Sequence, residues 1–203
     1  AEVTGPLSKT VSGRLFGVYE ERGGLLDVKT GDGPRTEDET SQYAFYSVRG
    51  QLRFEPSSDL EILLSADYTD REEDCCMGDY IAVDPARGPL ITLLAGGDGA
   101  SAFPIDPFDR VAFANRDATQ TTEDWGVSAN IEWQSGLGEL TSITSYRDWE
   151  NGSGQDTDFS AADLWYRDDE TSRDAFATFS QELRLASATD NVDWQVGVFY
   201  ANE

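Results

Sequence analysis

The stretch WGVSANIEWQ, residues 125–134, carries apolar side chains at its odd-numbered positions and polar ones at its even-numbered positions from Ser128 onward. Successive side chains of a β-strand point to opposite faces of the sheet. The alternation therefore predicts a strand with one apolar and one polar face.

The same alternation recurs along the chain. We predict seven strands, near residues 11–21, 43–54, 60–69, 125–134, 139–149, 175–186 and 192–200. The segment 139–149 mixes polar and apolar residues on both faces, so its orientation is left open. Residues 1–5 are expected to end one further strand. The predicted fold class is all-β, an antiparallel meander of about seven long strands.

The connections between these strands alternate in length. Short turns are expected at 55–59, 135–138 and 187–191, and long loops at 23–42, 70–124 and 150–174. A tilted strand of about 9–11 residues crosses a bilayer, whereas strands in globular proteins average about 5–6 residues. Long strands with short turns on one side and long loops on the other are typical of bacterial outer-membrane barrels. The pattern favours a segment of a large transmembrane β-barrel.

Aromatic residues gather near the predicted strand ends, where amphipathic rings favour a membrane interface. Those at the long-loop ends are Tyr19, Tyr68, Trp125, Trp149 and Tyr200, and those at the short-turn ends are Phe54, Trp133 and Trp194. We interpret the two groups as the two aromatic girdles of a barrel. An aromatic-rich soluble core is the alternative interpretation.

The polar faces of the strands carry charges. In a barrel we expect these to face the lumen: Arg14, Arg49, Arg53, Asp67, Glu132, Glu182 and Arg184. A soluble acidic β-sandwich, used for glycan binding or adhesion, would instead turn them to outside water. Both folds share the alternation of polar and apolar residues, so this alternation does not separate them. The length of the strands and the alternation of short and long connections favour the barrel.

The composition excludes several functions. The net charge is −24, with 39 acidic and 15 basic residues, which argues against nucleic acid because phosphate binding needs clustered Lys and Arg. The chain has no histidine, so a Ser–His–Asp triad is impossible, and no phosphate-binding glycine motif follows a strand. We predict no enzymatic activity, no catalytic residues and no cofactor.

Four phrases together cover six of the seven predicted strands, all but 125–134, and resemble the early barrel strands of TonB-dependent outer-membrane receptors. They are GPLSKTVSGRLFGVYEERGGLLD (5–27), YSVRGQLRFEPSSDLEILLSADYTDREED (46–74), GELTSITSYRDWEN (138–151) and FATFSQELRLASATDNVDWQVGVFYANE (176–203). The resemblance implies a location in the bacterial outer membrane and a barrel of about 22 strands with a plugged lumen.

The resemblance also implies transport. Such receptors import a scarce ligand, such as a ferric siderophore, cobalamin or an oligosaccharide, and take energy from the TonB complex through the plug domain. Outer-membrane lipid and lipopolysaccharide would be the other partners. We see no plug and no TonB box in residues 1–203, so we expect a partial barrel domain.

Two features of the long loops are candidate sites. Cys75 and Cys76 are adjacent, and three alternatives stay open: a disulfide between them, bridges to partners elsewhere, or free thiols. Acidic clusters at 37–39, 72–74, 156–158 and 168–170 suggest either a Ca²⁺ site or solvated loops bridged by divalent ions to lipopolysaccharide. Because no EF-hand spacing occurs, we favour solvated loops and predict no resident metal.

The loop 70–124 is longer than a passive connection requires. It contains the apolar phrases PLITLLAGG and FPIDPFDRVAF, which either contact ligand at the barrel mouth or only pack on neighbouring loops. The candidate ligand contacts are Tyr80, Phe103, Phe108 and Phe113.

Overall fold

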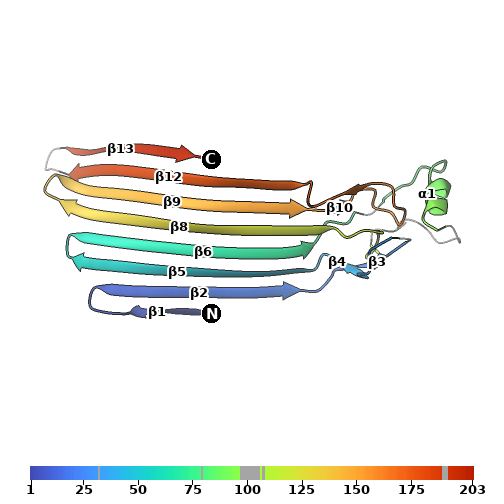
Figure 1. The fold of residues 1–203 in the computed structure, drawn as a ribbon, viewed down its shortest axis with the longest axis horizontal. Coiled ribbons are helices and arrows are strands. Elements are labelled where there is room, and N and C mark those ends of the chain that lie inside the picture. The colour runs from blue at the N-terminus through green and yellow to red at the C-terminus, as the bar shows by residue number, and fades with distance from the viewer. Residues whose placement is uncertain (32, 79, 97–105, 107, 189–191) are drawn as a thin grey trace.

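The computed structural model describes residues 1–31, 33–78, 80–96, 106, 108–188 and 192–203. Its main element is one eight-stranded antiparallel sheet (Figure 1). The strands are β1 (Glu2–Pro6), β2 (Val11–Arg22), β5 (Tyr43–Ser57), β6 (Leu60–Asp74), β8 (Thr119–Ser135), β9 (Gly138–Ser153), β12 (Arg173–Ala188) and β13 (Asp193–Asn202).

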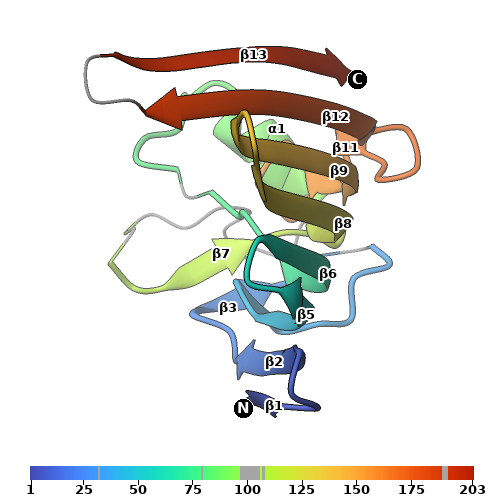
Figure 2. The same ribbon diagram turned by 90° about the vertical axis from the view of Figure 1, so that its left-hand side faces the viewer.

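Spatial order in this sheet follows chain order, so every neighbouring pair is antiparallel and the sheet is a meander. The predicted all-β class and antiparallel sheet are confirmed. Besides the seven strands predicted in full, the sheet contains β1 at the position expected for one further strand, paired with the start of β2 from Glu2↔Phe16 to Pro6↔Ser12. Figure 2 shows the eight strands as one twisted layer.

Several strands run farther toward the long loops than predicted. β6 continues to Asp74, and β8 begins at Thr119 rather than near 125. The added residues are polar on both faces, for example at the pair Glu72↔Thr121. In these added residues the alternation of polar and apolar side chains is absent, although the hydrogen-bonded ladder continues. The alternation therefore could not predict that the strands extend this far.

The short connections lie together at one end of the sheet, and the long ones at the other (Figure 1). Gly138 ends the turn between β8 and β9 with φ +136°, a region that favours glycine. A Cβ there would lie 2.2 Å from the carbonyl oxygen of Ala186. The connection between β5 and β6 carries a register shift between Phe54 and Ser57, where Pro56 has no ladder hydrogen bond to donate.

The long connections, residues 23–42, 75–118 and 154–172, meet beyond one end of the sheet, and we call them the loop lobe (Figure 1). Sequence reasoning treated them as plain loops, but they contain short elements. Strands β4 (Glu39–Thr40), β3 (Leu26–Lys29) and β7 (Val111–Phe113) form a small sheet in which β3 and β7 are parallel. β10 (Gln155–Asp156) pairs with β11 (Tyr166–Arg167), and α1 spans Gly88–Leu94.

Buried hydrophobic residues are confined to the loop lobe in the described part of the chain. A small cluster joins Val28 of β3 to Ala112 and Ala114 of the β7 region, with Leu26 and Met77 packed against it. The other buried apolar residues are Ala118, Ala161 and Ala162. The eight-stranded sheet thus contributes no buried hydrophobic residue among those described. Across the same residues, no helix combines the length and apolar character needed to cross a membrane.

Candidate functional site: the faces of the sheet and the loop lobe

The ladder register sorts the side chains of the main sheet into two faces, because residues directly opposite one another share a face. One of them, the apolar face, holds large hydrophobic side chains that are 36–69% exposed. They are Val3, Leu15, Tyr19, Tyr46, Val48, Leu52, Leu64, Trp125, Val127, Ile131, Trp133, Phe179, Leu183, Trp194, Val196, Val198 and Tyr200. An uncovered apolar surface this extensive marks an interaction surface.

A continuous row of aromatic rings crosses this face near the loop lobe, with one residue from each strand from β2 to β13. The loop-side aromatic row is Tyr19, Tyr46, Tyr68, Trp125, Tyr146, Phe179 and Tyr200. Three neighbours are directly opposite, as in Tyr68↔Trp125. The other three are diagonal but in ring contact, with centroids 5.8 Å apart for Tyr46 and Tyr68.

The diagonal steps give this row a constant slope. Each diagonal step places the next ring two residues nearer the short turns, whereas each direct step causes no shift. Because direct and diagonal steps alternate, the row moves two residues along the strands for every two strands that it crosses. A residue advances a strand by about 3.3 Å, and neighbouring strands are about 4.8 Å apart. A shift of two residues for every two strands therefore means that the strands are tilted by roughly 35° from the line perpendicular to the row. The row therefore has a single direction, which chance placement of rings on separate strands would not produce.

A second row, the turn-side aromatic row, consists of Phe54, Trp133 and Trp194. It has the same slope from β5 to β8, because Trp133 lies two positions nearer the turns than Ile131, and Ile131 is in register with Phe54 through Ile62. The rows are eight positions apart on β5 (46 to 54) and on β8 (125 to 133), and six positions apart on β13 (194 to 200). On strands inclined at about 35°, these separations correspond to roughly 22 Å and roughly 16 Å between the rows.

Trp149 corrects the predicted girdle. The register of β9, which sequence left open, puts Tyr146 on the apolar face and Trp149 on the opposite face. There the Trp149 ring stacks on Phe176, with centroids 4.7 Å apart. Tyr46, Tyr146 and Phe179 complete the loop-side row instead, and only the register could identify them.

Between the rows, the apolar face has a shallow hollow of about 980 Å³. Its floor includes the small residues Gly13, Gly50, Ala66 and Ala129. A Cβ added at Gly50 would meet no atom within 4 Å. The hollow therefore follows from a band of small side chains between larger ones.

Three polar residues also lie on this face between the rows. Gln181 accepts a hydrogen bond from the Thr144 hydroxyl (2.6 Å) and donates to the Ser142 hydroxyl (3.1 Å) and to the carbonyl oxygen of Glu182 (2.9 Å). Polar groups facing an apolar medium are costly unless paired. These bonds satisfy the Gln181 amide within the sheet.

The opposite, polar face holds all seven residues predicted to face a lumen. Arg14 pairs with Glu2 (3.1 Å), Arg53 with Glu61 (2.5 Å) and Arg184 with Glu182 (3.2 Å). Among the described residues, Arg49 and Glu132 make no ion pair. The shared face is an observation, whereas its facing a lumen stays a prediction.

Asp67 on this face belongs to a bridge across three strands. Arg147 of β9 contacts Asp124 of β8 (2.5 Å) and reaches over β8 to Asp67 of β6 (2.9 Å). Gly126 lies in register between Asp67 and Arg147, and a Cβ there would be 2.9 Å from Nη2 of Arg147. The glycine thus leaves room for the guanidinium, a role that sequence reasoning missed.

The loop lobe is tied to the sheet by Arg35, whose side chain is fully buried. Its guanidinium donates to the carboxylate of Asp74 at the end of β6 (2.6 Å) and to Asp117 (3.2 Å). It also donates to the carbonyl oxygens of Glu37 (3.0 Å) and Glu39 (2.7 Å). Nothing in the sequence distinguishes Arg35 from the other arginines, because its partners come from separate segments.

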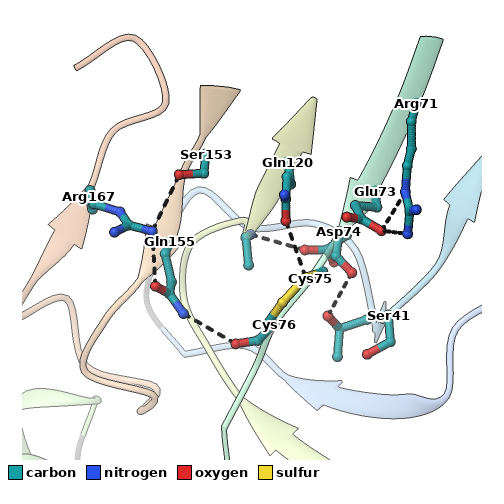
Figure 3. The surroundings of a disulfide bond; sticks show 12 residues. Ser41, Arg71, Glu73, Asp74, Cys75, Cys76, Gln120, Ser153, Gln155 and Arg167 are labelled. Atoms are coloured by element: carbon teal, nitrogen blue, oxygen red, sulfur yellow. Dashed lines mark hydrogen bonds and ion pairs between the residues drawn. A yellow bond between two sulfur atoms is a disulfide. The ribbon is translucent and has the colours of Figure 1, made fainter. Parts of the chain in front are cut away.

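The two cysteines lie where β6 enters the loop lobe, and a disulfide joins Cys75 to Cys76 (Figure 3). The backbone N–H of Cys75 donates to the carbonyl oxygen of Ala118 (2.7 Å). The amide of Gln155 donates to the carbonyl oxygen of Cys76 (3.3 Å). The pair therefore contacts the far end of its own connection, at Ala118, and the 154–172 segment, at Gln155.

Three of the four candidate ligand contacts lie in the described part of the loop lobe, and their surroundings differ. Tyr80 donates to the carbonyl oxygen of Asp158 (2.5 Å), and Phe113 is partly buried in β7 opposite Lys29. Phe108 is 90% exposed, and Phe103 lies outside the described residues. No group of three or more Asp, Glu or Cys side chains in the described segments is arranged to hold a metal ion.

A scan against known protein families finds no match to the chain, and a search of curated proteins finds no similar sequence.

Proposed function

We propose that this chain is part of the wall of a β-barrel in the bacterial outer membrane. The observation that carries the proposal is the exposed apolar face bounded by two aromatic rows. Transmembrane barrels have an outward apolar band about 25 Å tall between aromatic girdles and strands tilted by about 35–45°. The band of roughly 16–22 Å and the inclination of about 35° are close to those dimensions.

The polar face supports the same arrangement. Barrel strands alternate apolar residues toward lipid with polar residues toward the interior. Paired charges such as Arg53–Glu61 and the Arg147 bridge are all on the face opposite the aromatic rows. Hydroxyl pairs join them there, including Ser47–Thr69 (2.8 Å) and Ser145–Ser180 (2.7 Å).

The topology gives less support to the soluble β-sandwich. A sandwich closes two sheets face to face over a shared core. The described strands instead form one large sheet, with small sheets beyond its end, and the apolar face remains uncovered. A hydrocarbon medium is then the simplest cover for that face.

Within the barrel class, we propose a TonB-dependent receptor that takes up a scarce ligand such as a ferric siderophore, cobalamin or an oligosaccharide. The proposal rests on the four receptor-like phrases. The loop lobe supports it, because the long connections gather at one end of the sheet, and such a receptor would meet its ligand with its outer loops (Figure 1). Energy would come from the TonB complex through a plug domain.

The membrane proposal is tested with nitroxide spin labels at neighbouring positions on opposite faces. Leu64→Cys and Ser65→Cys are labelled in the complete polypeptide that contains this chain, reconstituted in phospholipid vesicles. We expect the label at 64 to collide with oxygen, which partitions into lipid, and to be shielded from a water-soluble nickel chelate. The label at 65 should lack that oxygen preference, because Ser65 lies on the polar face.

Equal access of the nickel chelate to both labels would overturn the membrane proposal. The narrower receptor proposal is tested separately by the sequence that flanks the chain in its polypeptide. We expect a plug domain upstream and an aromatic-ended closing strand downstream. A lipid-facing label without a plug would leave the barrel intact and reject the receptor.

A further inference from the structure

Asp156 connects two segments of the loop lobe from a buried position. It is 1% exposed and pairs in register with Tyr166 in the β10–β11 ladder. Its Oδ2 accepts hydrogen bonds from the backbone N–H groups of Asn115 (3.0 Å) and Arg116 (3.3 Å). One carboxyl group thus joins the 154–172 segment to the 75–118 segment.

The second oxygen of the same carboxyl group has no such support. Oδ1 of Asp156 is buried and has no hydrogen-bond partner in the described structure. A buried acceptor that is left unpaired destabilises the folded state, and more so when it carries charge. The ionised form of Asp156 is therefore poorly accommodated at this position.

The neighbouring acid, Asp158, adds to that cost through its negative charge. Asp158 is fully engaged: its Oδ1 accepts from the N–H and hydroxyl of Ser160, and its Oδ2 from the N–H groups of Leu164 and Trp165. Burial first, and then the negative charge of Asp158, raise the pKa of Asp156 to about 6.

Four other titratable groups of the lobe have pKa values that are shifted away from the range between pH 5 and 7.5. Burial and nearby acids raise the pKa of Tyr80 and of Tyr166 above the usual tyrosine value. The Arg116 guanidinium stays protonated because its hydrogen bond to Asp163 raises its pKa, and the same bond lowers the pKa of Asp163. Among these five groups, Asp156 is the one whose pKa lies in the mildly acidic range.

We propose that Asp156 is a proton-binding site whose occupancy tightens the loop lobe in mild acid. Protonation removes a buried charge and turns the unpaired oxygen into a hydroxyl that can donate. Because the folded lobe binds this proton more tightly than the unfolded segment does, lobe stability falls as pH rises and levels off above the folded pKa. The inference rests on the lobe geometry and does not depend on the membrane proposal.

The test is backbone hydrogen exchange of residues 111–118 and 154–172 in the full chain, measured at pH 5.0 and 7.5 and corrected for intrinsic exchange rates. A shift of the pKa from its usual value to about 6 predicts a roughly tenfold larger opening constant at pH 7.5 than at pH 5.0. Asp156→Asn, which imitates the protonated carboxyl, should keep at pH 7.5 the low opening constant of pH 5.0.

Asp163→Asn is the matched control, since Asp163 is a partly exposed acid of the same lobe paired with Arg116 (2.8 Å). It should retain the tenfold pH dependence even if it loosens the lobe at both pH values. A direct readout is the carboxyl ¹³C shift of Asp156, expected to titrate near pH 6. An opening constant that does not change with pH, or an Asp156 that titrates near pH 4, would overturn the proposal.

Discussion

The main sheet and the loop lobe are stabilised in opposite ways. The lobe excludes water from a small cluster around Val28 and Ala112 and buries the Arg35 guanidinium against Asp74. The sheet has a backbone ladder across eight strands, yet its large hydrophobic side chains remain exposed on one face. The lobe therefore has a small buried core of its own, whereas the apolar face of the sheet needs a surrounding medium or a partner to cover it.

The largest expected effect is a loss of stability in the loop lobe that leaves the sheet folded. Arg35→Ala should destabilise the lobe by about 3–5 kcal/mol, because it leaves the Asp74 carboxylate buried without its cation. The measurement is hydrogen exchange along the whole chain, with loss of protection expected in the lobe and not at mid-strand in the sheet.

Arg116→Ala provides the control for that experiment. Arg116 forms a two-bond pair with Asp163 in the same lobe, but both side chains are partly exposed. Exposed ion pairs contribute little, so the loss should be much smaller than for Arg35. Equal losses for the two variants would show that burial of the Arg35–Asp74 pair is not what holds the lobe.

The next largest effect separates the two faces of the sheet. Leu64→Arg places a charge on the apolar face midway between the aromatic rows, and should cost about 2–4 kcal/mol if that face meets lipid. Ser65→Arg, one residue later on the polar face, should lose only its hydrogen bond with Gln51, about 0.5–1.5 kcal/mol. The measurement is the free energy of unfolding in phospholipid vesicles. A larger cost at Ser65 would reverse our assignment of the faces.

The smallest effect concerns a turn far from the lobe. Gly138→Ala should cost about 1–3 kcal/mol, because alanine is strained at φ +136° and its Cβ would collide with the carbonyl oxygen of Ala186. Gly136→Ala in the same turn should be nearly neutral, since nothing lies within 4 Å of its Cβ position. Denaturant unfolding of both variants gives the comparison, and similar losses would contradict the turn geometry described above.

Period-two alternation sufficed to predict the sheet but not the lobe. In Trp125–Gln134 each residue type reports its own face, so the strand is readable locally. In Leu26–Lys29 the strand has four residues and takes its neighbours from two distant segments. The candidate site divides similarly: the seven charged residues of the polar face were predictable, whereas Arg35 and Asp156 matter because of partners far along the chain.

The sequence by itself determined that the chain is all-β, with long antiparallel strands that separate apolar from polar residues. Alternation is a local property that each strand carries alone, and this made the prediction possible. Only the tertiary structure decided the register, and with it which rings join into two sloping rows and why Trp149 is excluded from them. Register depends on how whole strands pair, and a shift of one residue would move every side chain to the other face.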